Sequence, residues 1–331
     1  MTNQLSIAID SGKHSTKSAS YINGTLQKVR FRTKVQGVEN LGIDIPMNNY
    51  LLELEGNSFL IGDSVSENRS DFSLSKNTKE HLLCIYLSIV KFLEKMGLIN
   101  SGIPTIRLAV NLPLSHYKNA KFRQEYEESI LNSQKPISLR INQKPFIFRI
   151  QSVLFLPEGT GPIYSRISEY RNKRVLIFDI GSLNVNFCEY QSLVPRLDSM
   201  FLSTQGINIL RSKITEELTT KYAKYGISIS QDDAEQILRD GYLFANGIKQ
   251  EESKAVIEDC KSSHVVEIFN FAKSRGLTFN NSILLFCGGG SIILKEAILS
   301  EFPSAVIDTD GVYANVLSYL KIMEAKGLVK A

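Results

Sequence analysis

The sequence is poor in cysteine and has no long apolar run. Its four cysteines are Cys84, Cys188, Cys260 and Cys287, and none of them forms a CxxC pair or lies near a histidine at metal-ligand spacing. Three of the four stand within apolar runs, so we expect small buried hydrophobes in a reducing compartment.

No apolar stretch reaches the roughly 18 residues that a membrane span requires. The N-terminal residues also lack the charged region followed by an apolar region that is typical of a secretory signal. We therefore expect a cytoplasmic protein that does not contact the membrane.

The chain has little net charge, +4 over 331 residues, and its Lys and Arg residues are dispersed. This balance gives no indication of direct, sequence-specific DNA binding. The cations within residues 28–35 fit a strand with one wet face, or alternatively a phosphate- or DNA-binding surface. A length of 331 residues with 43% hydrophobic content favours two domains, each with a core of ordinary size.

Periodicity and turn residues place the secondary structure. The first half has apolar or alternating runs typical of strands at 4–10, 17–23, 28–35, 50–55, 58–61 and 106–112, and a helical run at 79–96. The second half has strand-like runs at 174–178, 186–190 and 283–286, and helical runs at 206–222, 231–245, 252–275 and 312–323.

One element occurs in both halves: a strand that ends in Asp-x-Gly and continues into a hairpin. Its two copies are Asp10-Ser11-Gly12 and Asp179-Ile180-Gly181. Neither is a dinucleotide-binding fingerprint, which needs G-x-G-x-x-G at the start of a helix, and the chain has no G-x-x-x-x-G-K-[ST] loop. Two hairpin-type phosphate loops predict a two-lobed protein with a nucleotide clamped between the lobes.

The first loop, Asp10 to Lys17, has the groups that a phosphate site needs. The carboxylate of Asp10 can hold a hydrated Mg²⁺, and Gly12 lets backbone N–H groups approach phosphate oxygens. Ser15 and Thr16 offer hydroxyls, and Lys17 offers an ammonium group. The alternative is a polar hairpin without a ligand.

The second loop, Asp179 to Asn184, offers the same chemistry, with a structural turn as its alternative. Gly288-Gly289-Gly290-Ser291 lies between a buried strand and a helix, where glycines allow close approach of a flat or charged ligand. A mobile glycine loop is the alternative there. Glu158, in Phe155 to Gly161, either orients an attacking water or is an ordinary solvated loop residue.

With these four pieces in order, the sequence resembles the superfamily of actin, Hsp70 and the sugar kinases. The superfamily's five motifs, named phosphate-1, connect-1, phosphate-2, adenosine and connect-2, correspond to residues 10–17, 156–160, 179–184, 288–291 and 310–320. Within it, the chain most resembles plasmid-segregation actins of the ParM/StbA type. That likeness rests on the hairpin L-E-L-E-G-N-S-F-L-I-G-D, on V-N-L-P-L-S-H-Y at 110–117, and on P-E-G at 157–159.

The resemblance implies an α/β, actin-like, two-lobed fold of two duplicated mixed-sheet domains of the RNase H type, with a nucleotide cleft between them. Domain I would comprise residues 1–160 plus 315–331, including a small β-rich subdomain at about 28–100, and domain II residues 161–314. By the same resemblance, Glu158 polarises the hydrolytic water, and Asp10 and Asp179 act with it by holding Mg²⁺ through water. ATP or GTP would be contacted by Ser11, Gly12, Lys13, Ser15, Thr16, Lys17, Gly181, Ser182, Leu183, Asn184, Gly206, Gly288, Gly289, Gly290 and Ser291. In these proteins phosphate-2 usually reads D-x-G-G-x-T, whereas this chain has Ser182, Leu183 and Asn184 after Gly181.

The implied function is that of a filament-forming ATPase or GTPase that polymerises with bound nucleotide, is destabilised by hydrolysis and segregates plasmid DNA. Its partners would be further copies of itself and an adaptor protein bound to centromere-like plasmid DNA. One alternative is a small-molecule kinase or phosphatase of the same superfamily, although no N-x-D motif follows a strand where a kinase base belongs. Another is a non-plasmid bacterial cytoskeletal actin, such as a membrane-tethered division or pilus-assembly protein.

Overall fold

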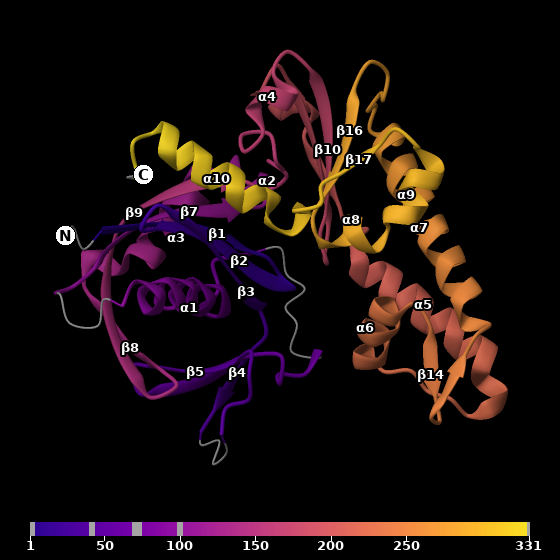
Figure 1. Ribbon diagram of the computed structural model, residues 1–331, viewed down its shortest axis with the longest axis horizontal. Helices are drawn as coiled ribbons and strands as arrows, with labels where there is room; N and C mark the ends of the chain where they lie inside the picture. The colour runs from indigo at the N-terminus through magenta and orange to yellow at the C-terminus, as the bar shows by residue number, and fades with distance from the viewer. Residues whose placement is uncertain (1–3, 40–43, 68–74, 98–101, 330–331) are drawn as a thin grey trace. The chain divides into compact units, whose positions relative to one another are not determined.

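The computed structural model describes residues 4–39, 44–67, 75–97 and 102–329 (Figure 1). The chain divides into two compact units, a first unit of Met1–Glu158 with Asn315–Ala331 and a second unit of Gly159–Ala314. It is a mixed α/β protein, as the sequence predicts.

Within the described residues, the first unit is organised around a mixed sheet of nine strands in which β1 is third from one edge. The strands run β3-β2-β1-β7-β9-β8-β5-β6-β4 across the unit. Their bounds are β1 (Gln4–Ser11), β2 (Ser15–Ile22), β3 (Thr25–Arg32), β4 (Val35–Val38), β5 (Asn49–Leu54), β6 (Asn57–Gly62), β7 (Thr105–Leu112), β8 (Ile137–Ile141) and β9 (Lys144–Pro157). β1 pairs antiparallel with β2 and parallel with β7, so the carboxyl ends of β1 and β7 lie at the same edge.

The long strand β9 joins the two parts of this sheet. Its first residues form an antiparallel hairpin with β8, and its last residues run parallel to β7 as far as Pro157. Glu158 therefore leaves the sheet beside the ends of β1 and β7.

Helix α1 (Lys79–Met96) has the bounds predicted from its periodicity. Thr78 caps its first turn, and Gly97 ends it at φ 66°, in the left-handed region that favours glycine. Its leucine- and isoleucine-rich length is buried on nearly every side, and Figure 1 shows it between strands β1–β3 and strands β5 and β8. The unit's other helices are α2 (Leu114–Tyr117), α3 (Ala120–Leu131), η2 (Asn132–Gln134) and the greater part of α10 (Ala314–Ala325).

Helix α10 closes the opposite face of the β1–β2–β7 sheet. Val316, Tyr319 and Leu320 pack on it where the strands carry alanines, Ala8 and Ala109 among them. The Tyr319 hydroxyl donates to the carbonyl of Pro157 over 2.8 Å, which fixes the chain next to Glu158.

Two of the cations within residues 28–35 have partners inside the first unit. Arg32 and Lys34 both contact the carboxylate of Glu67, at 2.6 and 3.0 Å, and Lys34 is buried. Arg30, by contrast, is exposed. This arrangement fits the interpretation of a strand with one wet face.

The second unit repeats the pattern of the first. β10 pairs antiparallel with the next strand, β11, and parallel with β16, as β1 does with β2 and β7. The strands are β10 (Arg174–Ile180), β11 (Val185–Gln191), β12 (Val194–Pro195), β13 (Phe201–Ser203), β14 (Leu243–Ala245), β15 (Ile248–Gln250), β16 (Ile283–Cys287) and β17 (Val306–Ile307). The helices are α4 (Ile167–Tyr170), η3 (Leu197–Ser199), α5 (Ile207–Tyr222), η4 (Ala223–Tyr225), α6 (Gln231–Asp240), α7 (Ser253–Ser274), α8 (Gly289–Ile293), α9 (Lys295–Glu301) and η5 (Gly311–Tyr313).

The prediction of a single helix over 231–245 is wrong in its second part. Helix α6 ends at Asp240 because Gly241 adopts φ 75° and its N–H bonds the carbonyl of Ile237. Strands β14 and β15 follow as a hairpin whose turn is Asn246-Gly247, both at positive φ. The Asn-Gly pair is the turn signal that the helical periodicity concealed.

In the described part of the chain, no helix combines the length and apolarity needed to cross a membrane. Cys84, Cys188 and Cys287 are buried and Cys260 is partly buried, and all four are free thiols. The role of small hydrophobe predicted for the cysteines fits these positions.

The core of the second unit contains one histidine, His264 on α7, whose side chain is fully buried. Burial lowers the pKa of His264 from 6.5 to about 4, with Lys213 acting in the same direction and Glu267 and a backbone hydrogen bond at Gln205 opposing. Between these two values the unfolded chain binds a proton that the folded chain does not. Stability therefore falls as the pH drops below 6.5, and the full loss is reached near pH 4.

Between pH 7 and pH 4 we expect the free energy of unfolding of His264→Leu to fall by about 3 kcal/mol less than that of the wild type. Urea unfolding at several pH values measures it. Ile268→Val, on the same helix, is the control, since its loss of about 1 kcal/mol should not depend on pH. An unchanged pH dependence in His264→Leu would contradict a neutral His264 in the fold.

Candidate functional site

The β1–β2 hairpin brings the polar residues of the first loop together. In its register Asp10 is opposite Lys17 and Ser11 is opposite Thr16. The Lys17 ammonium lies 3.7 Å from Asp10 Oδ2, and the Asp10 side chain keeps a small exposed area. A Cβ on Gly12 would come within 2.8 Å of both Lys17 Nζ and the carbonyl of Ser15, so the turn needs glycine there.

Other predicted residues of this loop have partners within the unit. Thr16 is fully buried and its hydroxyl shares a hydrogen bond of 2.9 Å with Thr33. Ser15 is also buried. The ammonium of Lys13 donates to the carbonyl of Ser75 over 2.7 Å.

Asn111, at the end of β7, connects Asp10 with Glu158. Its amide nitrogen donates to Asp10 Oδ1 at 2.6 Å and to Glu158 Oε1 at 3.1 Å. Its amide oxygen accepts from the backbone N–H of Ser11 at 2.9 Å. The residue is fully buried, so these bonds form out of reach of solvent and hold the two carboxylates in a fixed relation.

Glu158 is fixed by its backbone as well as by its side chain. Its N–H donates to the carbonyl of Leu112 over 2.8 Å, which extends the pairing of β9 with β7 by one step. Its carboxylate forms an ion pair with Lys76 in addition to the bond from Asn111. The side chain is almost fully buried, so it is not an ordinary solvated loop residue.

The sequence analysis did not single out Asn111 or Lys76. Asn111 had a signal, a lone amide within the apolar strand I-R-L-A-V-N-L one step before the strand end. Lys76 had none, because nothing in a short polar stretch indicates a contact with a residue 82 positions further on.

In the second unit, Asp179 ends β10 as Asp10 ends β1. The side chain is largely buried, and its Oδ2 accepts from the backbone N–H of Gly159 at 3.2 Å. The following loop closes on itself through a bond of 2.9 Å from Gly181 N–H to the carbonyl of Asn184.

Helix α5 begins against this loop. The N–H groups of Ile207 and Asn208 donate to the carbonyls of Gly181 and Ser182, at 3.1 and 2.8 Å. Gly206, the residue before the helix, lies so close that a Cβ would overlap the backbone of Ser182 and Leu183. The turn 181–184 is thereby fixed, although it lacks the glycine and threonine usual in phosphate-2.

The glycine run after β16 packs on the end of β10. Gly288 has φ 83°, and a Cβ on it would overlap the carbonyl of Ile180 and lie 2.6 Å from Asp179 Oδ1. A Cβ on Gly290 would overlap the side chain of Ile180, whereas one on Gly289 would meet nothing within 4 Å. Ser291 is buried and its hydroxyl donates to the carbonyl of Gly288 over 2.8 Å.

The predicted site residues thus form two groups, one in each unit. The first unit gathers Asp10, Ser11, Gly12, Lys17 and Glu158 at the ends of β1, β7 and β9. The second gathers Asp179 with residues 181–184, Gly206 and residues 288–291 at the ends of β10 and β16.

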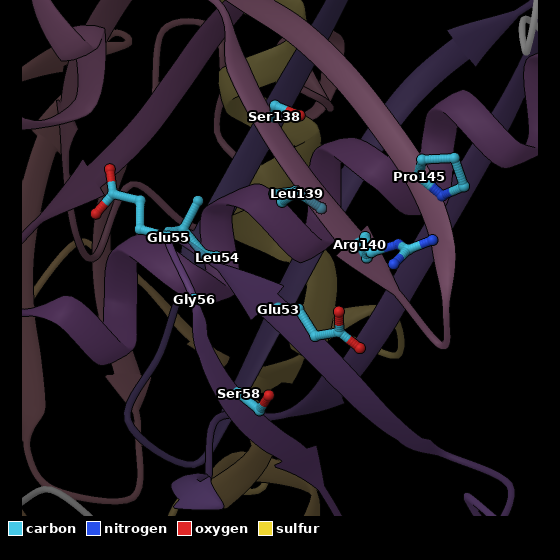
Figure 2. A pocket seen from close by; sticks show the side chains of 9 residues that line it. All are labelled: Glu53, Leu54, Glu55, Gly56, Ser58, Ser138, Leu139, Arg140 and Pro145. Carbon is cyan, nitrogen blue, oxygen red and sulfur yellow. The ribbon is translucent and has the colours of Figure 1, made fainter. Parts of the chain in front are cut away.

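The first unit also has a pocket of about 410 Å³ that contains none of the predicted residues (Figure 2). It is lined by residues of β5, β6, β8 and the start of β9. Its charged lining residues are Glu53 in β5, Glu55 in the turn after β5, and Arg140 in β8. Glu53 and Arg140 are opposite each other in the register of these two strands. The pocket is therefore separate from both groups.

Part of the chain is similar to a known protein family. Residues 8–161 match the family model of the N-terminal domain of actin-like proteins. The matched residues make up most of the first unit. No match was found among curated protein sequences.

Solved structures of actin-like proteins match this chain over nearly its whole length. An archaeal actin homologue, Ta0583, has a TM-score of 0.76 at 17% identity, covering 97% of this chain and 99% of that one, and another structure of it is a complex with ADP. The Alp12 filament structure has a TM-score of 0.70 at 26% identity, covering 98% and 100%. A 15-stranded ParM filament from Clostridium botulinum has a TM-score of 0.75 at 16% identity, covering 98% and 100%. The actin-like fold and the resemblance to the ParM-type proteins are confirmed.

The glycine run gives a test of this packing. We expect Gly290→Ala to lower the free energy of unfolding by about 1–3 kcal/mol, because the added methyl group must displace Ile180. Gly289→Ala is the matched control and should stay within about 0.5 kcal/mol of the wild type, since open space surrounds that position. Urea unfolding of both variants measures the difference, and equal losses would contradict the described packing.

Proposed function

We propose that this protein is an actin-like ATPase or GTPase that forms filaments in a nucleotide-dependent manner and segregates plasmid DNA. The observation that carries the proposal is the buried network in which Asn111 binds both Asp10 and Glu158 at the end of the phosphate-1 hairpin. It belongs to a chain whose solved structural neighbours include two filaments. The ADP complex of the archaeal homologue supports a nucleotide as the ligand.

The nucleotide would be bound by both loop groups. Lys17 and the backbone N–H groups around Gly12 would contact the terminal phosphates, and the open side of Gly289 would accept the nucleoside end. The complete proposed set is Ser11, Gly12, Lys13, Ser15, Thr16, Lys17, Gly181, Ser182, Leu183, Asn184, Gly206, Gly288, Gly289, Gly290 and Ser291. Of these, Thr16 and Ser291 would act by shaping the loops, since their hydroxyls are bonded to Thr33 and to Gly288.

The two loop carboxylates fit a magnesium site. Asp10 and Asp179 each end a central strand, each keeps a small exposed area, and both offer the oxygen ligands that Mg²⁺ prefers. Asn111 and the N–H of Gly159 hold the two carboxylates in place, and the Lys17 ammonium lies 3.7 Å from Asp10. When bound, the ion would neutralise charge on the phosphates.

Glu158 would orient the attacking water and accept its proton. Its backbone bond to Leu112 and its side-chain bond from Asn111 fix the carboxylate, and a positioned base of this kind contributes about 10²–10⁴ in rate. Hydrolysis would then weaken the contacts between subunits, because the nucleotide favours the polymerising state and its loss shifts the population away from it. An adaptor protein would link the filament to plasmid DNA.

Replacing the proposed base tests the chemistry. We expect Glu158→Gln to lower the turnover of ATP or GTP by about 10²–10⁴ while nucleotide affinity changes little, because the amide keeps the shape but cannot accept a proton. Phosphate release and titration with a fluorescent nucleotide measure the two quantities. Glu125→Gln, on the exposed surface of α3, is the control. Release that requires an added hydroxylated acceptor would instead favour a small-molecule kinase.

Polymerisation is tested separately. At tens of micromolar, the purified protein should sediment and scatter light with ATP or GTP and magnesium, and only weakly without them. After free nucleotide is depleted, polymers of Glu158→Gln should persist several times longer than polymers of the wild type, since their bound nucleotide is hydrolysed slowly. Absence of polymer with either nucleotide would contradict filament formation.

A further inference from the structure

Lys76 is a buried cation that the proposed reaction has so far not used. It lies in the short segment before α1, and only 3% of its side chain is exposed. Its ammonium group forms an ion pair with Oε1 of Glu158. Lysine is almost never buried to this degree unless it is paired, because removing an ammonium from water is costly.

The segment that carries Lys76 is fixed at both ends. Lys13, from the phosphate-1 turn, donates to the carbonyl of Ser75 over 2.7 Å. Thr78 caps the first turn of α1 by accepting from the N–H of His81. Lys76 is therefore held between the turn of the first hairpin and the start of a helix that is buried along most of its length.

A histidine on α2 also feels the charges of this region. His116, on α2, is partly buried and its pKa is lowered by burial, raised by Glu158 and lowered by Lys76 and Lys13. All three charged residues act on the same imidazole. The charges of this region thus extend from the phosphate-1 turn to α2.

The contacts link four charged side chains through the amide of Asn111. Lys76 and the amide of Asn111 both bind Oε1 of Glu158, and the same amide binds Asp10, which is paired with Lys17. In the contacts described, Lys76 binds Glu158 and no other member of this series. Its removal would therefore act first on the position of that carboxylate.

We propose that Lys76 is a positioning residue for nucleotide hydrolysis, which holds the carboxylate of Glu158 in the orientation needed to direct the attacking water. This inference rests on the proposed function of Glu158. It differs from a role of Lys76 as a phosphate ligand, which would act on nucleotide affinity and would not depend on Glu158.

The test is a double-mutant cycle between the two residues. We expect Lys76→Met to lower kcat by about tenfold to a hundredfold with nucleotide affinity nearly unchanged, because a displacement of about 1 Å at a catalytic group has effects of this size. In a Glu158→Gln background the same substitution should change kcat by less than about twofold, since residues that act as a unit are not additive. Lys76→Arg should retain part of the activity, and Lys79→Met, three positions along and exposed, is the matched control.

Thermal unfolding without nucleotide supplies a readout that does not need turnover. Lys76→Met removes the cation that is paired with the buried carboxylate of Glu158. The substitution should therefore lower the melting temperature by several degrees more in the wild-type background than in the Glu158→Gln background. Equal shifts in the two backgrounds would contradict the ion pair itself.

The remaining outcomes separate the two proposals. An unchanged kcat in Lys76→Met, an equal loss of kcat in both backgrounds, or a loss of affinity for triphosphate but not for diphosphate would overturn the positioning role. A wild-type protein that binds no nucleotide, or binds it without hydrolysis, would contradict the proposed function instead. If Lys76→Met does not fold, Lys76→Arg and Lys76→Gln are to be measured in the same cycle.

Discussion

The candidate site of the first unit depends on one buried amide. Asn111 is at the last step of β7, between β1 and β9, and from there its two polar atoms reach Ser11, Asp10 and Glu158. This position reaches all three because parallel neighbours bring the ends of β1 and β9 to either side of β7. A buried amide with these partners bonded is stabilising, whereas one left without them would cost about 1–3 kcal/mol. The geometry of the two carboxylates therefore follows from sheet order and one residue choice.

The second unit reaches a similar strand end by other means. Its central strand also ends in Asp-x-Gly between an antiparallel and a parallel neighbour. Here, however, Asp179 is held by a backbone N–H, and the surrounding loops approach through glycines at 206, 288 and 290, where a Cβ would overlap backbone or Ile180. In the first unit side chains fill the space around the carboxylate, and in the second unit backbone does. That difference explains why the second group has the glycine run 288–290 in addition to its Asp-x-Gly.

Much of the fold could be predicted because its signals are local. Helix α1 has a cap, a periodic apolar face and a terminal glycine within twenty residues, and both Asp-x-Gly strand ends are contiguous in sequence. The end of α6 was missed although its signals are local, because Gly241 and the Asn246-Gly247 turn interrupt a pattern that otherwise continues as a helix. Asn111 and Lys76 could not be assigned roles because their partners are distant in the chain and are chosen by topology. The atypical turn at 182–184 keeps its shape through α5 and Gly206, which the motif alone does not reveal.

The two points where the chain passes between the units lie beside the candidate loops. The first is between Glu158 and Gly159, whose N–H groups bond to Leu112 in the first unit and to Asp179 in the second. The second is at the start of α10, just after Gly311, whose carbonyl accepts from Gly288 N–H. If a nucleotide binds as proposed, its site includes Glu158, which is at the first passage, and Gly288, which is hydrogen-bonded to Gly311 near the second. A ligand shifts a protein between two states only as far as it binds one of them more tightly, and a nucleotide that controls assembly has to meet this condition.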